Sequence, residues 1–404
     1  MDARSHISFD GLGIAPQVLG VLDRLKFKIP TPIQQKAIPL AIEGKDLVGI
    51  AQTGTGKTLA FAIPMVQRLS QKKGKGLVLV PTRELAIQVD ETFQKVGPLF
   101  GIRSAVVIGG ASMNEQIRAL RKNPGVIIAT PGRLIDHMNQ RNVTLSDTHV
   151  LVLDEADRML DMGFLPQIQS ILQAIPRDRQ TMLFSATMPQ AVASIAASHM
   201  KLPVNIEIAP SGTLVEKLTQ ELFIVKKENK NELLRKLLTQ YRGSVLIFTR
   251  TKIGAHRTAR DIKAMSYNSA EIHSDRTLAQ RREALEGFKS GRYRVLVATD
   301  IAARGIDVTG IEVVINYDLP EEAENYVHRI GRTCRAGHQG HAISFATPDQ
   351  NTDVRNIERL IRTALPISEH PEIPIERFLA PTRYSFAPRG SRHARGPSRR
   401  RFRH

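Results

Sequence analysis

The chain has 404 residues, of which 42% are hydrophobic and 24% are charged, and its formal net charge is +18. This length suits two α/β domains that each bury a core, and the composition excludes a collagen, a coiled coil and general disorder. There is no run of about 18 or more uncharged apolar residues and no apolar leader, so we expect a cytoplasmic protein without a membrane span. The single cysteine, Cys334, excludes an intrachain disulfide framework and fits a reducing compartment.

Short apolar, β-branched runs alternate with amphipathic stretches, a pattern typical of buried parallel strands connected by helices. The first series of expected strands covers residues 47–50, 77–80, 105–108, 126–129, 150–153, 181–184 and 204–208. The second series covers residues 221–225, 245–248, 269–272, 294–298, 313–316 and 341–346. The restart of the pattern predicts two successive α/β units.

A turn-rich segment at residues 209–217, containing Pro210, Ser211 and Gly212, separates the two series and is the expected interdomain linker. We therefore predict an α/β fold with domain 1 at residues 1–208, domain 2 at 218–366 and a C-terminal extension at 367–404. The end of that extension, residues 383–404, is rich in Arg, Ser, Gly and Pro and is expected to be disordered.

The positive charge is concentrated near the C-terminus. The segment from Arg377 to His404 contains nine Arg and no Asp or Glu, which is half of the net charge. A basic balance predicts a polyanionic partner, but by itself it fits RNA, DNA, the ribosome or a membrane surface. Tyr384, Phe386 and Phe402 alternate with these arginines, which favours base stacking and an RNA tether without sequence preference. The alternative is a tail that only aids solubility.

Residues 51–58 read Ala-Gln-Thr-Gly-Thr-Gly-Lys-Thr and lie between an expected strand and an expected helix, the context that a P-loop requires. Its glycines allow backbone N–H groups to face phosphate oxygens at a helix N-terminus. The Lys57 side chain would reach the β and γ phosphates, and the Thr58 hydroxyl would bind Mg²⁺. The expected nucleotide contacts are Gln52, Thr53, Gly54, Thr55, Gly56, Lys57 and Thr58.

An acidic run follows another expected buried strand, at residues 154–157. Asp154 is suited to hold Mg²⁺ through water, and Glu155 is placed to orient or deprotonate the attacking water. The alternative is an acidic first turn of a solvated helix.

The four letters D-E-A-D at residues 154–157 resemble the signature of the DEAD-box family of superfamily 2 helicases. The resemblance extends from residue 9 to about residue 365, and the short flanks with an Arg-rich tail are similar to the bacterial RhlE-like type. It implies two RecA-like domains, ATP and Mg²⁺, and RNA-stimulated ATP hydrolysis that separates short RNA duplexes or remodels ribonucleoprotein. It also implies a monomer, with ribosome-assembly or RNA-decay proteins as partners.

Further motifs carry the resemblance. Thr31 and Gln34 are similar to the Q motif that recognises adenine, with Phe27 as the stacking aromatic and Phe9 as the upstream aromatic. Ser185 and Thr187 resemble the motif that couples hydrolysis to strand separation through Asp157. Arg332 and Arg335 resemble the arginine fingers, and His328 and Arg329 the interdomain network. In the motif at residues 298–307, the resemblance implies that Thr299 and Gly305 contact RNA. It also implies that Asp307 contacts the ribose of the nucleotide and that Gly305 lies close to the nucleotide as well.

The same resemblance implies an RNA track along the strand ends of both domains, where helix N-termini offer N–H groups to phosphates. The implied residues are Pro81, Thr82, Arg83, Gly109, Gly110, Thr130, Pro131, Gly132 and Arg133, with Arg281, Thr299 and Gly305 in domain 2. Contacts of this kind read RNA shape instead of sequence. For each site the alternative is helix capping alone.

Three positions depart from the family pattern. Lys26 and Cys334 stand where the family usually has Gly, and Leu278 stands where it usually has the Gln of a Gln-x-x-Arg motif. Leu278 therefore puts one RNA contact in doubt, while Cys334 would strain a left-handed backbone or make the ATPase sensitive to oxidation. Two other function classes stay open: an RNA clamp or chaperone with a slow ATPase, and a DNA-directed translocase.

Overall fold

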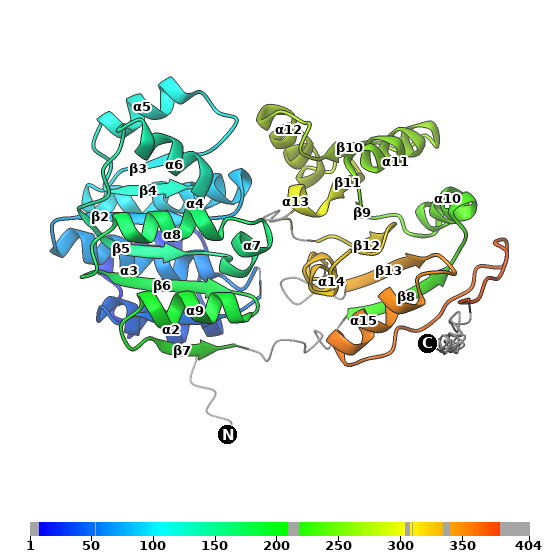
Figure 1. Cartoon of the computed structure of the whole chain (residues 1–404), viewed down its shortest axis with the longest axis horizontal. Coiled ribbons are helices and arrows are strands. Elements are labelled where there is room, and N and C mark those ends of the chain that lie inside the picture. The colour runs from blue at the N-terminus through cyan, green and yellow to red at the C-terminus, as the bar shows by residue number, and fades with distance from the viewer. Residues whose placement is uncertain are drawn as a thin grey trace, which may run out of the picture.

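The computed structural model describes residues 8–52, 54–208, 218–303, 308, 310–333 and 340–379. Several predicted features lie outside these residues: the linker at 209–217, the Arg-rich segment 383–404, Thr53, Gly305, Asp307, Cys334 and Arg335. The described chain forms two α/β units, each with its own parallel sheet (Figure 1).

The first sheet has seven strands in the order β3-β4-β2-β5-β6-β1-β7, and every pairing is parallel. Its strands are β1 (Leu47–Ile50), β2 (Lys75–Leu79), β3 (Ser104–Val107), β4 (Val126–Ala129), β5 (Thr148–Leu153), β6 (Gln180–Ser185) and β7 (Val204–Glu207). The helices are α1 (Pro16–Arg24), α2 (Pro32–Ile42), α3 (Lys57–Gln71), α4 (Arg83–Val96), α5 (Met113–Arg121), α6 (Pro131–Asn139), α7 (Ala156–Asp161), α8 (Leu165–Ala174) and α9 (Gln190–His199), with a 3-10 turn η1 (Gly97–Phe100).

The second sheet has six strands in the order β10-β11-β9-β12-β13-β8, again all parallel. Its strands are β8 (Leu218–Ile224), β9 (Val245–Thr249), β10 (Ser269–Ile272), β11 (Val295–Thr299), β12 (Val313–Asn316) and β13 (Gly340–Ala346). The helices are α10 (Lys230–Gln240), α11 (Lys252–Ala264), α12 (Leu278–Lys289), α13 (Asp300–Ala303), α14 (Ala323–Ile330) and α15 (Asn351–Ile361), with a 3-10 turn η2 (Lys227–Asn229).

Helices cover both faces of each sheet, which explains why the central strands are largely apolar, whereas the edge strands β7 and β8 contain polar, partly exposed residues. In domain 1 one apolar cluster contains Phe61 of α3 and Phe93 of α4, and the cluster on the other face contains Leu134 of α6 and Ile168 of α8. All thirteen expected strands are present, with ends that differ from the prediction by a few residues. The predicted α/β fold with two parallel sheets is confirmed.

The packing of domain 2 continues beyond the predicted boundary at residue 366. Ile367 forms a parallel bridge with Leu222 of β8, and the backbone N–H of Ser368 donates to the Leu222 carbonyl at 2.9 Å. Ile373 is buried in the domain core. The sequence placed the boundary too early because this segment has little strand pattern and gains its order from the sheet edge that it covers.

Among the described helices, none combines the length and the apolar character needed to cross a membrane.

Candidate functional site

The strand order of the first sheet sorts its motifs into two halves. The P-loop follows β1, the acidic run follows β5, and Ser185 ends β6, and these three strands are neighbours in the order β5-β6-β1. The expected RNA motifs follow β2, β3 and β4, which form the adjoining half β3-β4-β2. Because carboxyl ends of parallel strands meet at one edge, the motifs expected to bind nucleotide and those expected to bind RNA lie side by side there.

The P-loop has the backbone that phosphate binding requires. Gly54 and Gly56 have φ of 83° and 88°, and Gly56 is the N-cap of α3. Lys57 is 6% exposed, and its Nζ donates to the Ala51 carbonyl at 2.8 Å. The Lys57 side chain thus folds back over the P-loop and hydrogen-bonds to the residue at which that loop begins.

Gln34 fastens the adenine motif to the P-loop. Its Nε2 donates to the Gly56 carbonyl at 3.0 Å, and its Oε1 accepts from the Thr31 N–H at 2.9 Å. A Cβ on Gly56 would lie 2.4 Å from Nε2, so glycine is required here for space as well as for φ. Each amide atom of Gln34 keeps one further hydrogen-bonding position, which is what an adenine edge needs.

The aromatic residues of this motif differ in exposure. Phe27 is 47% exposed, which leaves its ring open to a base. Lys26 before it has φ of 62°, the left-handed region that favours glycine, so the departure from the family pattern costs backbone strain. Phe9, in contrast, is 4% exposed and belongs to the apolar core of domain 1.

Glu155 is held by an unusual backbone and a buried ion pair. Its φ is 52°, and its Oε2 accepts from the Arg158 guanidinium at 2.9 Å, with both side chains almost fully buried. Burial alone would raise the pKa of Glu155, but the charges of Arg158, Lys57 and Arg332 outweigh it and lower that pKa. Glu155 is therefore ionised at neutral pH, as a group that attracts a water proton must be.

Asp154 behaves differently beside it. Its side chain accepts the Glu155 N–H at 3.0 Å and is 2% exposed. Burial raises the pKa of Asp154 to about 6, against the opposing charge of Lys57. A buried carboxylate with this tendency to take up a proton is stabilised by any cation that binds to it. Within the described residues, no group of three or more His, Cys, Asp or Glu is placed to hold a metal alone.

Asp157 connects the acidic run to the end of β6. Its Oδ2 accepts from the N–H groups of Ala186 and Thr187 at 3.1 and 2.8 Å and from the Thr187 hydroxyl at 2.9 Å. The expected contact with Ser185 is also present, but it runs from the backbone N–H of Asp157 to the Ser185 hydroxyl at 3.1 Å. Any displacement of residues 154–157 is therefore passed directly to the loop after β6.

Domain 2 supplies Arg332 to the same place. Arg332 is 3% exposed, and its charge contributes to the lowered pKa of Glu155 in domain 1. A small cavity is lined by Arg158 from domain 1 together with His328, Arg332 and Asp300 from domain 2. The two halves of the predicted ATP site therefore face each other.

Arg329 has a more local position than the sequence suggested. Its guanidinium donates to both oxygens of Asp300 at 2.5 and 2.6 Å and lies over the Phe248 ring. It also donates to the Asn316 side chain and the Asp318 carbonyl. All these partners belong to domain 2, so Arg329 joins its strand ends to one another, and its expected part in an interdomain network is indirect.

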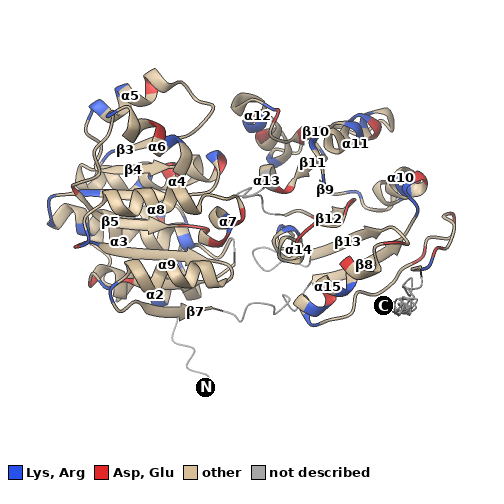
Figure 2. Cartoon of the chain, in the orientation of Figure 1, with Lys and Arg blue, Asp and Glu red and all other residues tan. Residues whose placement is uncertain are grey.

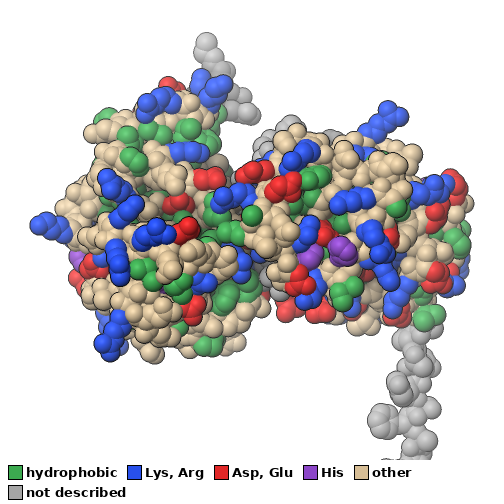
Figure 3. All heavy atoms as spheres, turned by 90° about the horizontal axis from the view of Figure 1, so that it is seen from above, with side chains coloured by type: hydrophobic (Ala, Val, Ile, Leu, Met, Phe, Trp, Pro, Cys, Tyr) green, Lys and Arg blue, Asp and Glu red, His purple; other side chains and the backbone are tan. Residues whose placement is uncertain are grey.

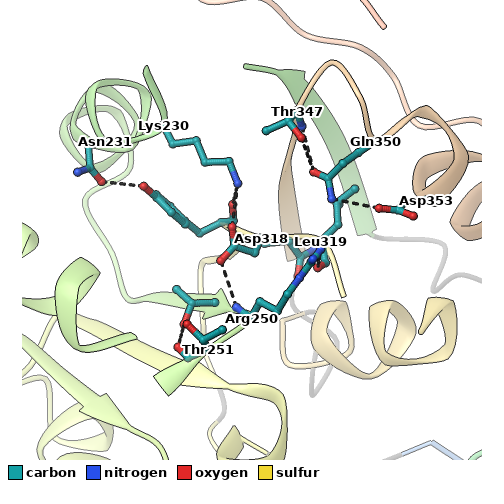
Figure 4. Close-up of polar contacts among 12 residues, drawn as sticks. Lys230, Asn231, Arg250, Thr251, Asp318, Leu319, Thr347, Gln350 and Asp353 are labelled. Atoms are coloured by element: carbon teal, nitrogen blue, oxygen red, sulfur yellow. Dashed lines mark hydrogen bonds and ion pairs between the residues drawn. The ribbon is translucent and has the colours of Figure 1, made fainter. Parts of the chain in front are cut away.

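Asp318 extends this network toward α10 and α11, as Figure 4 shows. Its carboxylate accepts from Lys230 Nζ at 2.8 Å and from the Arg250 N–H at 3.1 Å. Arg250 in turn donates to the Leu319 carbonyl at 3.3 Å. Burial alone would raise the pKa of Asp318, but the Lys230 ammonium together with the backbone N–H and charge of Arg250 lowers it. One side chain thus connects the Arg329 cluster to the start of α11.

We expect Asp318→Asn to lower the unfolding free energy by about 1 to 3 kcal/mol at pH 7, because Lys230 loses its charged partner. Since the folded-state pKa is depressed, this contribution is present above the unfolded-state pKa of about 4 and is lost as pH falls through the folded-state value. Urea unfolding at pH 7 and pH 3.5 measures it. Asp353→Asn, which removes a carboxylate that accepts from Gln350 Nε2 at 3.1 Å, is the control. Equal stability of the two variants at pH 7 would contradict the expectation.

The RNA half of the first sheet is built around Arg83. A Cβ on Gly110 would lie 2.0 Å from the Arg83 guanidinium, so Gly110 makes room for that side chain where it now lies. Thr82 caps α4, and Arg133 donates to the Ala111 carbonyl at 3.2 Å. Gly132 has open space around it. Figure 2 shows Lys and Arg on helices and loops around both sheets, with the strands largely free of them.

Thr130 and Pro131 start α6 at the end of β4, as the sequence predicted. Thr299 ends β11 at the corresponding edge of the second sheet. Sequence analysis missed the start of α11, where Thr251 caps the helix by accepting the Gly254 N–H at 3.0 Å. The signal was available, because residues 250–252 follow the buried strand β9 just as Thr82 and Arg83 follow β2.

Arg281, one of the residues expected to contact RNA, contacts domain 1 in this structure. Its guanidinium donates to Glu84 of domain 1 at 2.8 Å, and both side chains are buried. Burial lowers the pKa of Arg281, against the opposing charge of Glu84. In this arrangement the Arg281 guanidinium is paired with the buried Glu84 carboxylate and connects domain 2 to domain 1.

With this geometry in place, the comparisons with known proteins are specific. Residues 31–195 match the model of the DEAD/DEAH box helicases, and residues 229–337 match that of the helicase conserved C-terminal domain. An ATP-dependent rRNA helicase RRP3 from Debaryomyces hansenii is 42% identical over 90% of this chain and 77% of its own length. The helicase CshA from Geobacillus kaustophilus is 43% identical over 87% of this chain and 76% of its own length.

Solved structures agree. The S. cerevisiae Dbp5 structure bound to RNA and ADP BeF3 superposes with a TM-score of 0.81 at 33% identity, covering 89% of this chain and 95% of that one. The Mss116p structure bound to ssRNA and AMP-PNP gives 0.83 at 28% identity, covering 92% and 81%. The chain belongs to the DEAD/DEAH box helicase family, and its two parallel-sheet domains are RecA-like. It is an RNA-stimulated ATPase and ATP-dependent RNA helicase.

Proposed function

We propose that ATP binds against domain 1, with each part of the nucleotide held by a different set of residues. Gln34 reads the adenine edge and Phe27 stacks on the base, while the P-loop N–H groups and Lys57 hold the phosphates. The described P-loop backbone, with Gly56 as a left-handed N-cap, supports this assignment. Thr53 is assigned with the loop by sequence.

Mg²⁺ fits the residues beside the phosphates. Thr58 begins α3 next to Lys57, and Asp154 is a buried carboxylate whose pKa burial raises to about 6. One hydroxyl and one carboxylate, completed by phosphate oxygens and water, form the kind of set that Mg²⁺ prefers. Bound there, the ion would neutralise charge on the phosphates.

Glu155 then orients and deprotonates the attacking water, and Arg332 stabilises the negative charge that develops on the transferred phosphoryl group. Arg335 is assigned as the second finger from sequence alone. The observation that carries this proposal is the cavity that Arg332 of domain 2 shares with Arg158 of domain 1, the ion-pair partner of Glu155. Hydrolysis requires both domains, so closure controls it.

We further propose that RNA crosses both domains at the carboxyl ends of β2, β3 and β4 and of β9 and β11. Thr82, Thr130 and Thr251 start helices there, and helix N-termini favour phosphates over bases. Binding is therefore independent of sequence. The rRNA helicase among the relatives supports a role in ribosome assembly, with RNA decay as the other pathway for a cytoplasmic monomer of RhlE-like type.

The test is ATP hydrolysis titrated with single-stranded RNA and with DNA of the same sequence and length. We expect RNA to raise kcat at least tenfold and DNA to give little stimulation. A parallel assay follows release of the shorter strand from an RNA duplex in the presence of ATP. Hydrolysis without RNA dependence, or equal stimulation by DNA, would contradict the proposal. Stimulated hydrolysis without strand release would favour an RNA clamp.

A further inference from the structure

The first turn of α12 is a preformed contact between the domains. Thr277 accepts the Gln280 N–H at 3.3 Å, and the Gln280 side chain accepts the Thr277 N–H at 3.0 Å. This reciprocal capping box fixes the start of the helix. Leu278, the first helical residue, therefore projects from a rigid backbone.

Leu278 is half-buried and packs against the apolar cluster of domain 1. Across the described part of domain 2, no other apolar side chain joins either core cluster of domain 1. Leu278 borders a groove of about 550 Å³ with Ile87 of α4 and Val106 of β3. The contact is thus a single apolar side chain that one domain inserts against the other.

Arg281 lies one turn after Leu278, so the two side chains share a helix face. Its ion pair with Glu84 is buried, and a buried pair gains little net stability because both charges lose their water. An apolar contact has no such desolvation cost. The ion pair therefore fixes the register of the two domains, and Leu278 supplies the net attraction.

We propose that Leu278 is a positioning residue that biases the two domains toward the closed arrangement before ATP and RNA bind. Closed here means the arrangement of this structure, in which Arg332 of domain 2 and Arg158 of domain 1 line one cavity. Seen from above, the domains are two lobes joined at a narrow waist, where side chains of both charges lie close together (Figure 3). Water screens such charges, so a small apolar contact has a measurable share of the closing free energy. A residue that stabilises only the closed state lowers the ligand concentration needed to populate it.

Truncation separates this role from folding. Leu278→Ala removes the contact, Leu278→Met retains an apolar side chain of similar volume, and Leu379→Ala removes an exposed leucine elsewhere in domain 2. The distance between the domains is followed by energy transfer between two dyes. In a chain whose single cysteine is removed by Cys334→Ser, the dyes are attached at Ser170→Cys in α8 and Asn356→Cys in α15. We expect Leu278→Ala to lower the closed-to-open ratio about three- to tenfold without ligands. Leu278→Met and Leu379→Ala should resemble the parent.

ATPase kinetics give the second readout. This readout rests on the RNA-stimulated ATPase activity, whereas the energy-transfer measurement does not depend on any activity. For Leu278→Ala the RNA concentration at half-maximal ATPase should rise about three- to tenfold, with kcat unchanged once RNA and ATP saturate. An unchanged energy-transfer distribution would overturn the proposal. A loss of kcat and thermal stability that Met does not restore would also overturn it, by showing a purely structural residue.

Discussion

Glu155→Gln should lower the RNA-stimulated kcat by about 100- to 10,000-fold while ATP-dependent RNA binding persists. The substitution keeps the shape of the side chain but removes the carboxylate that would accept the water proton. The structure makes this residue a strong candidate, because the charges of Arg158, Lys57 and Arg332 outweigh burial and lower the pKa of Glu155. The measurement is steady-state ATP hydrolysis at saturating RNA, with RNA affinity measured beside it.

The buried ion pair with Arg158 requires a control for folding. Glu155→Gln leaves the Arg158 charge without its carboxylate, which can cost about 3 to 5 kcal/mol of stability. RNA binding in the presence of ATP requires a folded protein, so its retention separates lost chemistry from lost structure. Glu207→Gln, at the exposed last residue of the edge strand β7, is the matched substitution and should leave kcat unchanged. A loss of kcat below tenfold would remove Glu155 from the catalytic step.

Arg332→Lys should lower kcat by about 1,000-fold or more with a much smaller change in the KM for ATP. Lysine keeps the charge but lacks the planar fork that contacts two phosphoryl oxygens, and a finger of this kind acts mainly on the transition state. Arg355→Lys, on an exposed turn of α15, is the matched control. The measurement is kcat and KM at saturating RNA.

A double variant sharpens this prediction. If Glu155 and Arg332 act on the same step, Glu155→Gln combined with Arg332→Lys should lose little more kcat than the worse single variant. Fully multiplicative losses would mean that Glu155 and Arg332 act independently of each other. An Arg332→Lys kcat within tenfold of the parent would mean that Arg332 does not serve hydrolysis.

The sequence by itself determined the strands and the chemistry at their ends. A parallel strand that is buried on both faces needs a mostly apolar sequence. All thirteen strands were therefore predictable without any knowledge of their neighbours. The P-loop and the acidic run were predictable for a similar reason, because the residues that make each half-site are adjacent in the chain. The left-handed backbone at Gly56 follows from local glycine chemistry.

Only the tertiary structure decided which side chains meet. Arg281 and Glu84 are 197 positions apart, so no local pattern assigned Arg281 to an ion pair instead of RNA. Phe9 and Phe27 belong to one motif, yet packing buries the first and exposes the second. Leu278 looked like a lost RNA contact because the apolar surface that receives it belongs to another domain. Contacts between distant segments depend on how whole domains pack against each other. That packing brings Arg332 of domain 2 to the acidic run of domain 1.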